Sequence, residues 1–126
     1  MIPKSFLMCE DDPVYVETVA YMFELYAPES ELIVVYSLHD AIALLEYKPD
    51  AFDIIIIDLM LPDSKDIYTL RAFLRVAQDT PLVVLTAHRE FEQECIRLGA
   101  REYILKNNIS GKCLVERLHK IAEEWC

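Results

Sequence analysis

Glycine is scarce in this sequence, which contains only Gly99 and Gly111 among its 126 residues. Phosphate-binding loops of the GxxxxGK[ST] and GxGxxG types need several glycines within a few positions, because their backbone approaches the bound phosphates closely. Two isolated glycines cannot build such a loop. The sequence therefore excludes ATP, GTP and dinucleotide sites of these kinds.

Paired cysteines are also lacking. The four cysteines, Cys9, Cys95, Cys113 and Cys126, form no CxxC pair and have no histidines at zinc-like spacing. Cys9 and Cys95 lie within apolar patterns. A chain of this length can bury a core without disulfides or structural metal. We therefore expect free thiols in a reducing cytosol.

Long apolar runs and an excess of basic residues are missing as well. No segment approaches the ~18 apolar residues of a membrane span, and the N-terminus lacks the pattern of a signal peptide. Twelve basic residues against 22 acidic ones give a formal charge of −10, which disfavours nucleic acid and anionic membranes as partners. We expect a cytoplasmic protein with one domain over residues 1–126, no output domain in this chain, and no direct contact with nucleic acid or membrane.

The most informative stretch is a run of four isoleucines, Ile54–Ile57, followed directly by Asp58. The run has no alternating polar face, so both of its faces should be covered, as in the central strand of a parallel sheet. Ligands of open α/β sheets gather outside the carboxyl ends of the strands. Asp58 is therefore a candidate functional residue.

The remaining chain alternates between short apolar runs and helical patterns. We expect strands near residues 6–9, 32–36, 54–57, 82–85 and 103–105, and helices near residues 14–26, 37–47, 67–76 and 89–98 and at the C-terminus. Five alternating strand and helix units predict a flavodoxin-like α/β fold, (βα)5, doubly wound. Its parallel sheet should have the strand order 2-1-3-4-5, with helices on both faces.

Apolar residues at helical spacing predict which side chains of the helices face the sheet. Over residues 89–98 this apolar stripe is thin, and Gly99 ends the pattern, so we expect that helix to be the least firmly attached. For the other helices the expected inward residues are Val16, Val19, Phe23 and Tyr26; Ala41, Leu44 and Leu45; Ile67, Leu70, Phe73 and Leu74; and Leu114, Leu118, Ile121 and Trp125.

Polar side chains end four of the expected strands. Glu10 and Asp11 follow the first strand, Asp58 the third, Thr86 the fourth and Lys106 the fifth. In the order 2-1-3-4-5 the switch point lies between the first and third strands, where the carboxylates should meet. Carboxylates that share a site repel one another unless a cation neutralises them. Mg²⁺ suits such a site, because it takes one or two carboxylates, waters and a substrate phosphate.

These groups predict phosphoryl transfer to an aspartate. Asp58 would attack phosphorus as the nucleophile, and Mg²⁺ and Lys106 would offset charge on the phosphoryl oxygens. Thr86 would donate a hydrogen bond to one of these oxygens. The small side chain of Ala87 would leave room for the donor.

Four motifs in this order resemble the receiver domain of two-component response regulators. They are FLMCEDD at residues 6–12, DLMLP at 58–62, LTA at 85–87 and GAREYILK at 99–106. The resemblance covers nearly the whole chain. It implies that Asp58 is the phosphoacceptor and that Mg²⁺ is the cofactor.

The resemblance also implies the roles of the surrounding residues. Asp11 and Asp58 would be side-chain ligands of Mg²⁺, the Met60 carbonyl a backbone ligand, and Glu10 would act through a metal-bound water. Thr86 would move toward the phosphoryl group while the Tyr103 ring turns inward, so that the two form a switch pair.

Four further positions are compared with the family pattern, and two of them depart from it. Met60 and His88 lie where similar proteins tune phosphoryl lifetime, although a solvent-facing histidine without a role explains His88 equally well. Asn107 replaces the usual proline after Lys106, and we expect a trans peptide bond there, because a cis bond would cost about 3 kcal/mol. Asp66 replaces a common glycine and tolerates positive φ less well than glycine, which leaves the loop shape open.

The leading hypothesis is a phosphorylation-switched signalling module that catalyses only its own phosphorylation and dephosphorylation. A histidine kinase or phosphotransfer protein would be the donor. An output domain, a partner protein or a second copy of the chain would bind the face formed by the fourth helix, fifth strand and fifth helix. A pseudo-receiver that binds partners without phosphorylation is the alternative. A Mg²⁺-dependent hydrolase or a flavodoxin is disfavoured, because the DxDx[TV] signature and a Ser/Thr/Gly-rich loop after the first strand are absent.

Overall fold

The computed structural model describes residues 1–124, in which five strands and five α-helices alternate along the chain. The expected inward position of Trp125 and the expected free thiol of Cys126 lie outside these residues. In chain order the elements are β1 (Ser5–Cys9), α1 (Pro13–Tyr26), β2 (Glu31–Val35), α2 (Leu38–Tyr47), β3 (Ile54–Ile57), α3 (Ile67–Ala77), β4 (Leu82–Thr86), α4 (Glu92–Leu98), β5 (Glu102–Leu105), a 3-10 turn (Lys106–Asn108) and α5 (Gly111–Glu124).

The strands form one parallel sheet in the order β2-β1-β3-β4-β5, which confirms the predicted fold. Cys9 pairs with Ile57 at the carboxyl ends of β1 and β3. Thr86 pairs with Leu105 at the ends of β4 and β5. The register therefore places the residues that follow these four strands along one edge of the sheet.

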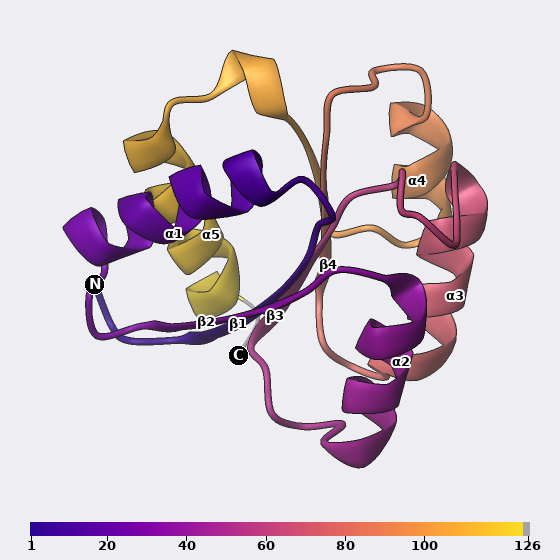
Figure 1. The fold of residues 1–126 in the computed structure, drawn as a ribbon, viewed down its shortest axis with the longest axis horizontal. Coiled ribbons are helices and arrows are strands. Elements are labelled where there is room, and N and C mark those ends of the chain that lie inside the picture. Colours follow the sequence, from indigo (N-terminus) through magenta and orange to yellow (C-terminus); the bar gives the residue numbers. More distant parts are fainter. Residues whose placement is uncertain (125–126) are drawn as a thin grey trace.

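Helices cover both faces of the sheet. Helices α1 and α5 lie on one face and α2, α3 and α4 on the other (Figure 1). The isoleucines of β3 alternate between two separate core clusters: Ile54 and Ile56 pack on the side of α1 and α5, and Ile55 and Ile57 on the side of the other helices. Their exposed fractions are at most 1%, so both faces of this strand are covered as predicted.

Side chains from neighbouring loops cap the first two helices. The Asp12 carboxylate accepts a hydrogen bond from the Val14 N–H, and Pro13 occupies the first helical turn of α1, where its missing N–H does no harm. Ser37 caps α2, because its hydroxyl accepts a hydrogen bond from the Asp40 N–H. Asp63 adds a cap that the sequence did not indicate, because its carboxylate accepts from the N–H groups of both Leu38 and His39 in α2.

Two expectations about the helices were wrong. Helix α4 begins at Glu92 instead of residue 89, and no side chain caps it; the preceding residues 87–90 form an exposed loop. Tyr26 is 39% exposed instead of facing the core. It lies at the last turn of α1, where Phe23 and Ala27 fill the core instead.

A buried histidine joins α5 to the loop before β2, at the amino ends of the strands. His119 is 1% exposed, and its Nδ1 lies 2.8 Å from the Val115 carbonyl oxygen, to which it donates because a carbonyl only accepts. Its Nε2 lies 2.6 Å from the Ser30 hydroxyl. The ring packs against Phe6 and Phe23. The apolar pattern of α5 did not reveal this polar core residue.

The two departures from the family pattern, at Asn107 and Asp66, differ in backbone geometry. The Lys106–Asn107 bond is trans, as expected, as are the other peptide bonds within residues 1–124. Asp66 has φ 60° and ψ −148° at the N-terminus of α3, a conformation that glycine adopts far more readily than aspartate. Among residues 1–124, no helix has both the length and the apolar character needed to cross a membrane.

Candidate functional site

Three carboxylates meet at the carboxyl ends of β1 and β3. Oxygen atoms of Glu10, Asp11 and Asp58 lie within 4.8 Å of one another. Glu10 and Asp58 are buried, with exposed fractions of 2% and 7%, whereas Asp11 is exposed. Like charges this close repel one another, so a nearby cation stabilises the cluster.

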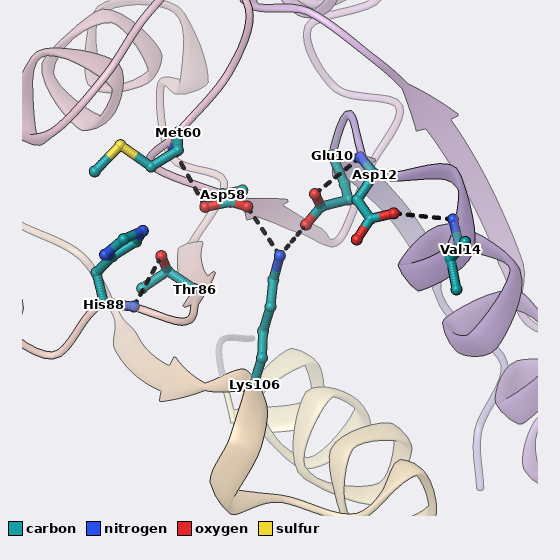
Figure 2. Close-up of polar contacts among 8 residues, drawn as sticks. All are labelled: Glu10, Asp12, Val14, Asp58, Met60, Thr86, His88 and Lys106. Carbon is teal, nitrogen blue, oxygen red and sulfur yellow. Dashed lines mark hydrogen bonds and ion pairs between the residues drawn. The ribbon is translucent and has the colours of Figure 1, made fainter.

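Lys106 supplies one positive charge. Its Nζ atom lies 2.6 Å from a carboxylate oxygen of Glu10 and 2.9 Å from one of Asp58 (Figure 2). The lysine follows β5 directly, so the sheet register carries its ammonium group to the ends of β1 and β3. The structure thus brings together Glu10, Asp11, Asp58 and Lys106, which the sequence placed at three separate strand ends.

Burial and these ion pairs shift the pKa values of the site. Burial, together with the charge of Asp58, raises the pKa of Glu10, while the hydrogen bond from Lys106 opposes this change. Burial disfavours the ammonium form of Lys106, but its hydrogen bonds to Glu10 and Asp58 outweigh that effect and raise its pKa. Lys106 therefore remains a cation at neutral pH.

Tyr15 is a site residue that the sequence reasoning missed. Its ring lies under the Lys106 ammonium, with Nζ 4.4 Å from the ring centroid, a distance at which the π face attracts a cation. Burial raises the pKa of Tyr15 to about 12, so the phenol stays neutral. Its position in the first turn of α1, three residues after Asp12, was the only hint in the sequence.

Thr86 and Tyr103 both contact the backbone of His88. The fully buried Thr86 hydroxyl accepts a hydrogen bond from the His88 N–H at 3.4 Å (Figure 2). The Tyr103 hydroxyl donates to the His88 carbonyl oxygen, and the tyrosine is only 9% exposed. The ring is thus already directed inward in this structure. The His88 side chain is exposed and lies 3.5 Å from Glu90.

The loop after β3 places the backbone of Met60 beside Asp58. The Met60 N–H donates to the carboxylate of Asp58 at 3.2 Å (Figure 2). Carboxylate oxygens are ligands that Mg²⁺ accepts. Glu10, Asp11 and Asp58 therefore form a group of carboxylates that can hold a divalent cation at this edge.

Comparisons with known proteins agree with this geometry. Residues 6–119 match the family described as response regulator receiver domain. The chain is 32% identical over 120 residues to the transcriptional regulatory protein CpxR of Escherichia coli (strain K12), a match that covers 94% of this chain and 49% of CpxR. CpxR of Shigella flexneri gives the same values. The chain thus spans about half the length of these curated relatives.

Solved structures share the fold. The signal receiver domain of a putative LuxO repressor protein from Vibrio parahaemolyticus has a TM-score of 0.82 at 20% identity, covering 98% of this chain and 93% of that one. The receiver domain of a sensor histidine kinase from Pseudomonas aeruginosa, solved with a magnesium ion coordinated in its active site cleft, has a TM-score of 0.75 at 21% identity, covering 98% and 97%. The family match and the sequence identity to CpxR place this chain in the family of response regulator receiver domains.

Proposed function

We propose that this receiver domain is the phosphoacceptor of a cytoplasmic two-component phosphorelay and that Asp58 takes the phosphoryl group. The proposal rests on the charged groups that surround the carboxylate of Asp58. Its carboxylate lies beside those of Glu10 and Asp11 and 2.9 Å from the Lys106 ammonium. A nucleophile, a set of cation ligands and a fixed positive charge are the parts that phosphoryl transfer needs.

The donor set fits Mg²⁺. Asp11, Asp58 and the Met60 carbonyl would hold the ion directly, and Glu10 would act through a bound water. When bound, the ion neutralises charge on the phosphoryl oxygens. The magnesium ion described in the receiver domain from Pseudomonas aeruginosa supports this assignment.

The protein's own groups would carry the transfer. A carboxylate oxygen of Asp58 forms a bond to phosphorus while the bond from phosphorus to the donor nitrogen of a phosphohistidine breaks, and the imidazole leaves. Lys106 offsets the charge on the phosphoryl oxygens, and the hydroxyl of Thr86 donates to one of them. Ala87 is small and exposed, so a donor protein or a small phosphodonor can approach Asp58.

The signal would leave the site through the face formed by α4, β5 and α5. Thr86 would release the His88 N–H when it turns to the phosphoryl group, which couples the site to the loop that also binds Tyr103. A hollow of about 430 Å³ lies on this face, lined by residues that include Arg89, Tyr103 and Arg117. Its occupant would be an output domain, a partner protein or a second copy of the chain.

His88 and Met60 would tune the lifetime of the phosphoryl group.

Phosphorylation by a small donor tests this function. Incubation with acetyl phosphate and Mg²⁺ should add one phosphoryl group, measured by intact mass spectrometry, and hydroxylamine should remove it, as expected for an acyl phosphate. Asp58→Asn and Asp11→Ala should abolish the added mass. Asp12→Asn is the matched control, because Asp12 belongs to the same acidic run but caps α1, and it should still be labelled.

The same experiment addresses the alternative. A pseudo-receiver would bind partners without taking up phosphate, so an unlabelled wild-type protein that still binds Mg²⁺ would favour it. Labelling that persists in Asp58→Asn, or that is independent of Mg²⁺, would reject the proposed site.

A further inference from the structure

Thr69 is a buried hydroxyl residue of α3 outside the set of residues that the proposed transfer uses. Its exposed fraction is 0%. Its Oγ1 donates to the Leu59 carbonyl oxygen at 2.8 Å, and the Ser64 hydroxyl lies 2.7 Å from the same Oγ1. Thr69 has a single hydroxyl proton, which the carbonyl takes, so Ser64 is the donor in the second bond. The three groups form a directed chain from Ser64 through Thr69 to Leu59.

This chain fixes the peptide group before Met60. The carbonyl of that peptide belongs to Leu59 and is bound by Thr69, while its N–H belongs to Met60 and donates to Asp58 at 3.2 Å. A peptide group is planar. Hydrogen bonds at both of its ends therefore set its orientation.

The peptide group after Met60 is also fixed by a hydrogen bond, and this bond again involves Ser64. It contains the Met60 carbonyl and the Leu61 N–H, and this N–H donates to the Ser64 carbonyl oxygen at 2.8 Å. In a trans peptide the carbonyl points away from the N–H, so the Met60 carbonyl is directed away from Ser64. The Ser64 side chain is in turn bound to Thr69.

We propose that Thr69 is a positioning residue for the cation site, because its hydroxyl binds the peptide group before Met60 directly and acts on the one after it through Ser64, and so aims the Met60 carbonyl. This inference rests on the proposed function, in which that carbonyl is a Mg²⁺ ligand. Groups that orient a metal ligand typically change metal affinity by about 10- to 100-fold when they are removed. Thr69 acts from α3, without contacting the ion.

A purely structural role makes a different prediction. Thr69→Val keeps the shape of the side chain but leaves the Leu59 carbonyl without its donor, which lowers stability in either case. If Thr69 positions the cation site, folded Thr69→Val should also bind Mg²⁺ more weakly. If its role is purely structural, the folded variant should bind Mg²⁺ as wild type does. Affinity and stability therefore have to be measured on the same samples.

The experiment is calorimetric titration of purified protein with Mg²⁺ alone, at a temperature where circular dichroism shows each variant folded. Thr69→Val should raise the Kd for Mg²⁺ about ten-fold or more. Thr69→Ser retains the hydroxyl and should bind nearly as wild type does. Val115→Ala is the control for general destabilisation, because Val115 is fully buried on α5, on the opposite face of the sheet; it should lower Tm and leave the Kd unchanged.

The outcomes separate this inference from the proposed function. A wild-type Kd in folded Thr69→Val, or an equal loss of affinity in Val115→Ala, overturns the inference while the Mg²⁺ site stands. If the wild-type protein does not bind Mg²⁺, the proposed site itself is wrong. Asp11→Ala is the negative control for the titration signal without binding. If Thr69→Val does not fold, Ser64→Ala replaces it; a weaker affinity supports the chain of hydrogen bonds, and an unchanged one contradicts it.

Discussion

The Nζ atom of Lys106 lies 2.6 Å from a carboxylate oxygen of Glu10, which is almost completely buried. The same ammonium contacts Asp58, so one lysine compensates two buried carboxylates. Removing one partner of a buried ion pair leaves uncompensated charge and typically costs about 3–5 kcal/mol. This relationship makes Lys106 a stability determinant as well as a proposed catalytic group.

Lys106→Met should therefore destabilise the metal-free protein at pH 7 by about 3 kcal/mol, measured by urea unfolding. Mg²⁺ should reduce the loss, because a cation bound only by the folded site stabilises it. Lys112→Met is the control, since Lys112 is exposed, and it should change stability by less than about 0.5 kcal/mol. Equal effects of the two substitutions would contradict the ion-pair role.

The loss caused by Lys106→Met should depend on pH. Burial raises the pKa of Glu10 above its ordinary value of 4.5, and Lys106 is a group that lowers it, so the variant has a still higher Glu10 pKa. When a carboxyl group has a higher pKa in the folded state than in the unfolded state, its protonated form stabilises the folded protein. This stabilisation is complete below the unfolded-state pKa and is lost as pH rises through the folded-state pKa. The stability difference between variant and wild type should shrink as pH falls from 7 toward 4.5. Urea midpoints that differ by a constant amount over this range would disprove the linkage.

Tyr15 should support transfer through its contact with Lys106. Tyr15→Leu removes the ring under the ammonium, a contact worth roughly 0.5–2 kcal/mol, and should slow labelling by acetyl phosphate several-fold at saturating Mg²⁺. Tyr15→Phe keeps the ring and should label at nearly the wild-type rate. Tyr21→Leu on the exposed side of the same helix is the control. A loss of rate in Tyr15→Phe equal to that in Tyr15→Leu would assign the effect to the hydroxyl.

The strands were predictable because their signals are local, and their order was predictable because five alternating strand and helix units favour one doubly wound arrangement. Four adjacent isoleucines define a covered strand, and polar residues at strand ends lie at the same edge once the order is known. The contacts of Tyr15, Asp63 and His119 were not predictable in this way. Each joins segments far apart in the chain, such as Ser30 and His119, and depends on side-chain directions that periodicity does not specify.

The start of α4 shows a second kind of limit. The polar sequence from Arg89 onward has helical spacing, but without a capping side chain the residues before Glu92 remain a loop. The Tyr103 hydroxyl binds the His88 carbonyl in that loop. A tertiary contact thus competes with local helix propensity, and the sequence pattern alone does not contain it.

Asp66 offers a test of backbone strain. At φ 60° and ψ −148°, a side chain is disfavoured by roughly 1–3 kcal/mol, whereas glycine loses more conformational entropy on folding. The net effect of Asp66→Gly should be a stabilisation of about 1 kcal/mol, measured by urea unfolding. Asp66→Ala should be less stable than wild type, because alanine tolerates positive φ worse than aspartate. The strain is absent if the glycine variant is no more stable than wild type.

The last prediction concerns the loop around His88, which Thr86 and Tyr103 hold from two sides. Helix α4 follows this loop and buries only Cys95 within the core, whereas six residues of α5 are buried. An element with so few buried contacts shifts readily between arrangements. A phosphoryl group that recruits the Thr86 hydroxyl would free the His88 N–H and so change the loop and α4.

Amide hydrogen exchange with Mg²⁺ and beryllofluoride, a phosphoryl mimic, measures this change. Protection should change across residues 87–106, while α1 remains nearly constant and serves as the internal reference. Thr86→Ala should still bind the mimic at Asp58 but lose most of the change, because it has no hydroxyl to move. Tyr103→Phe should lower protection in residues 88–91 even without the mimic, since it removes the bond to the His88 carbonyl. A full wild-type response in Thr86→Ala would show that the signal does not pass through this hydroxyl.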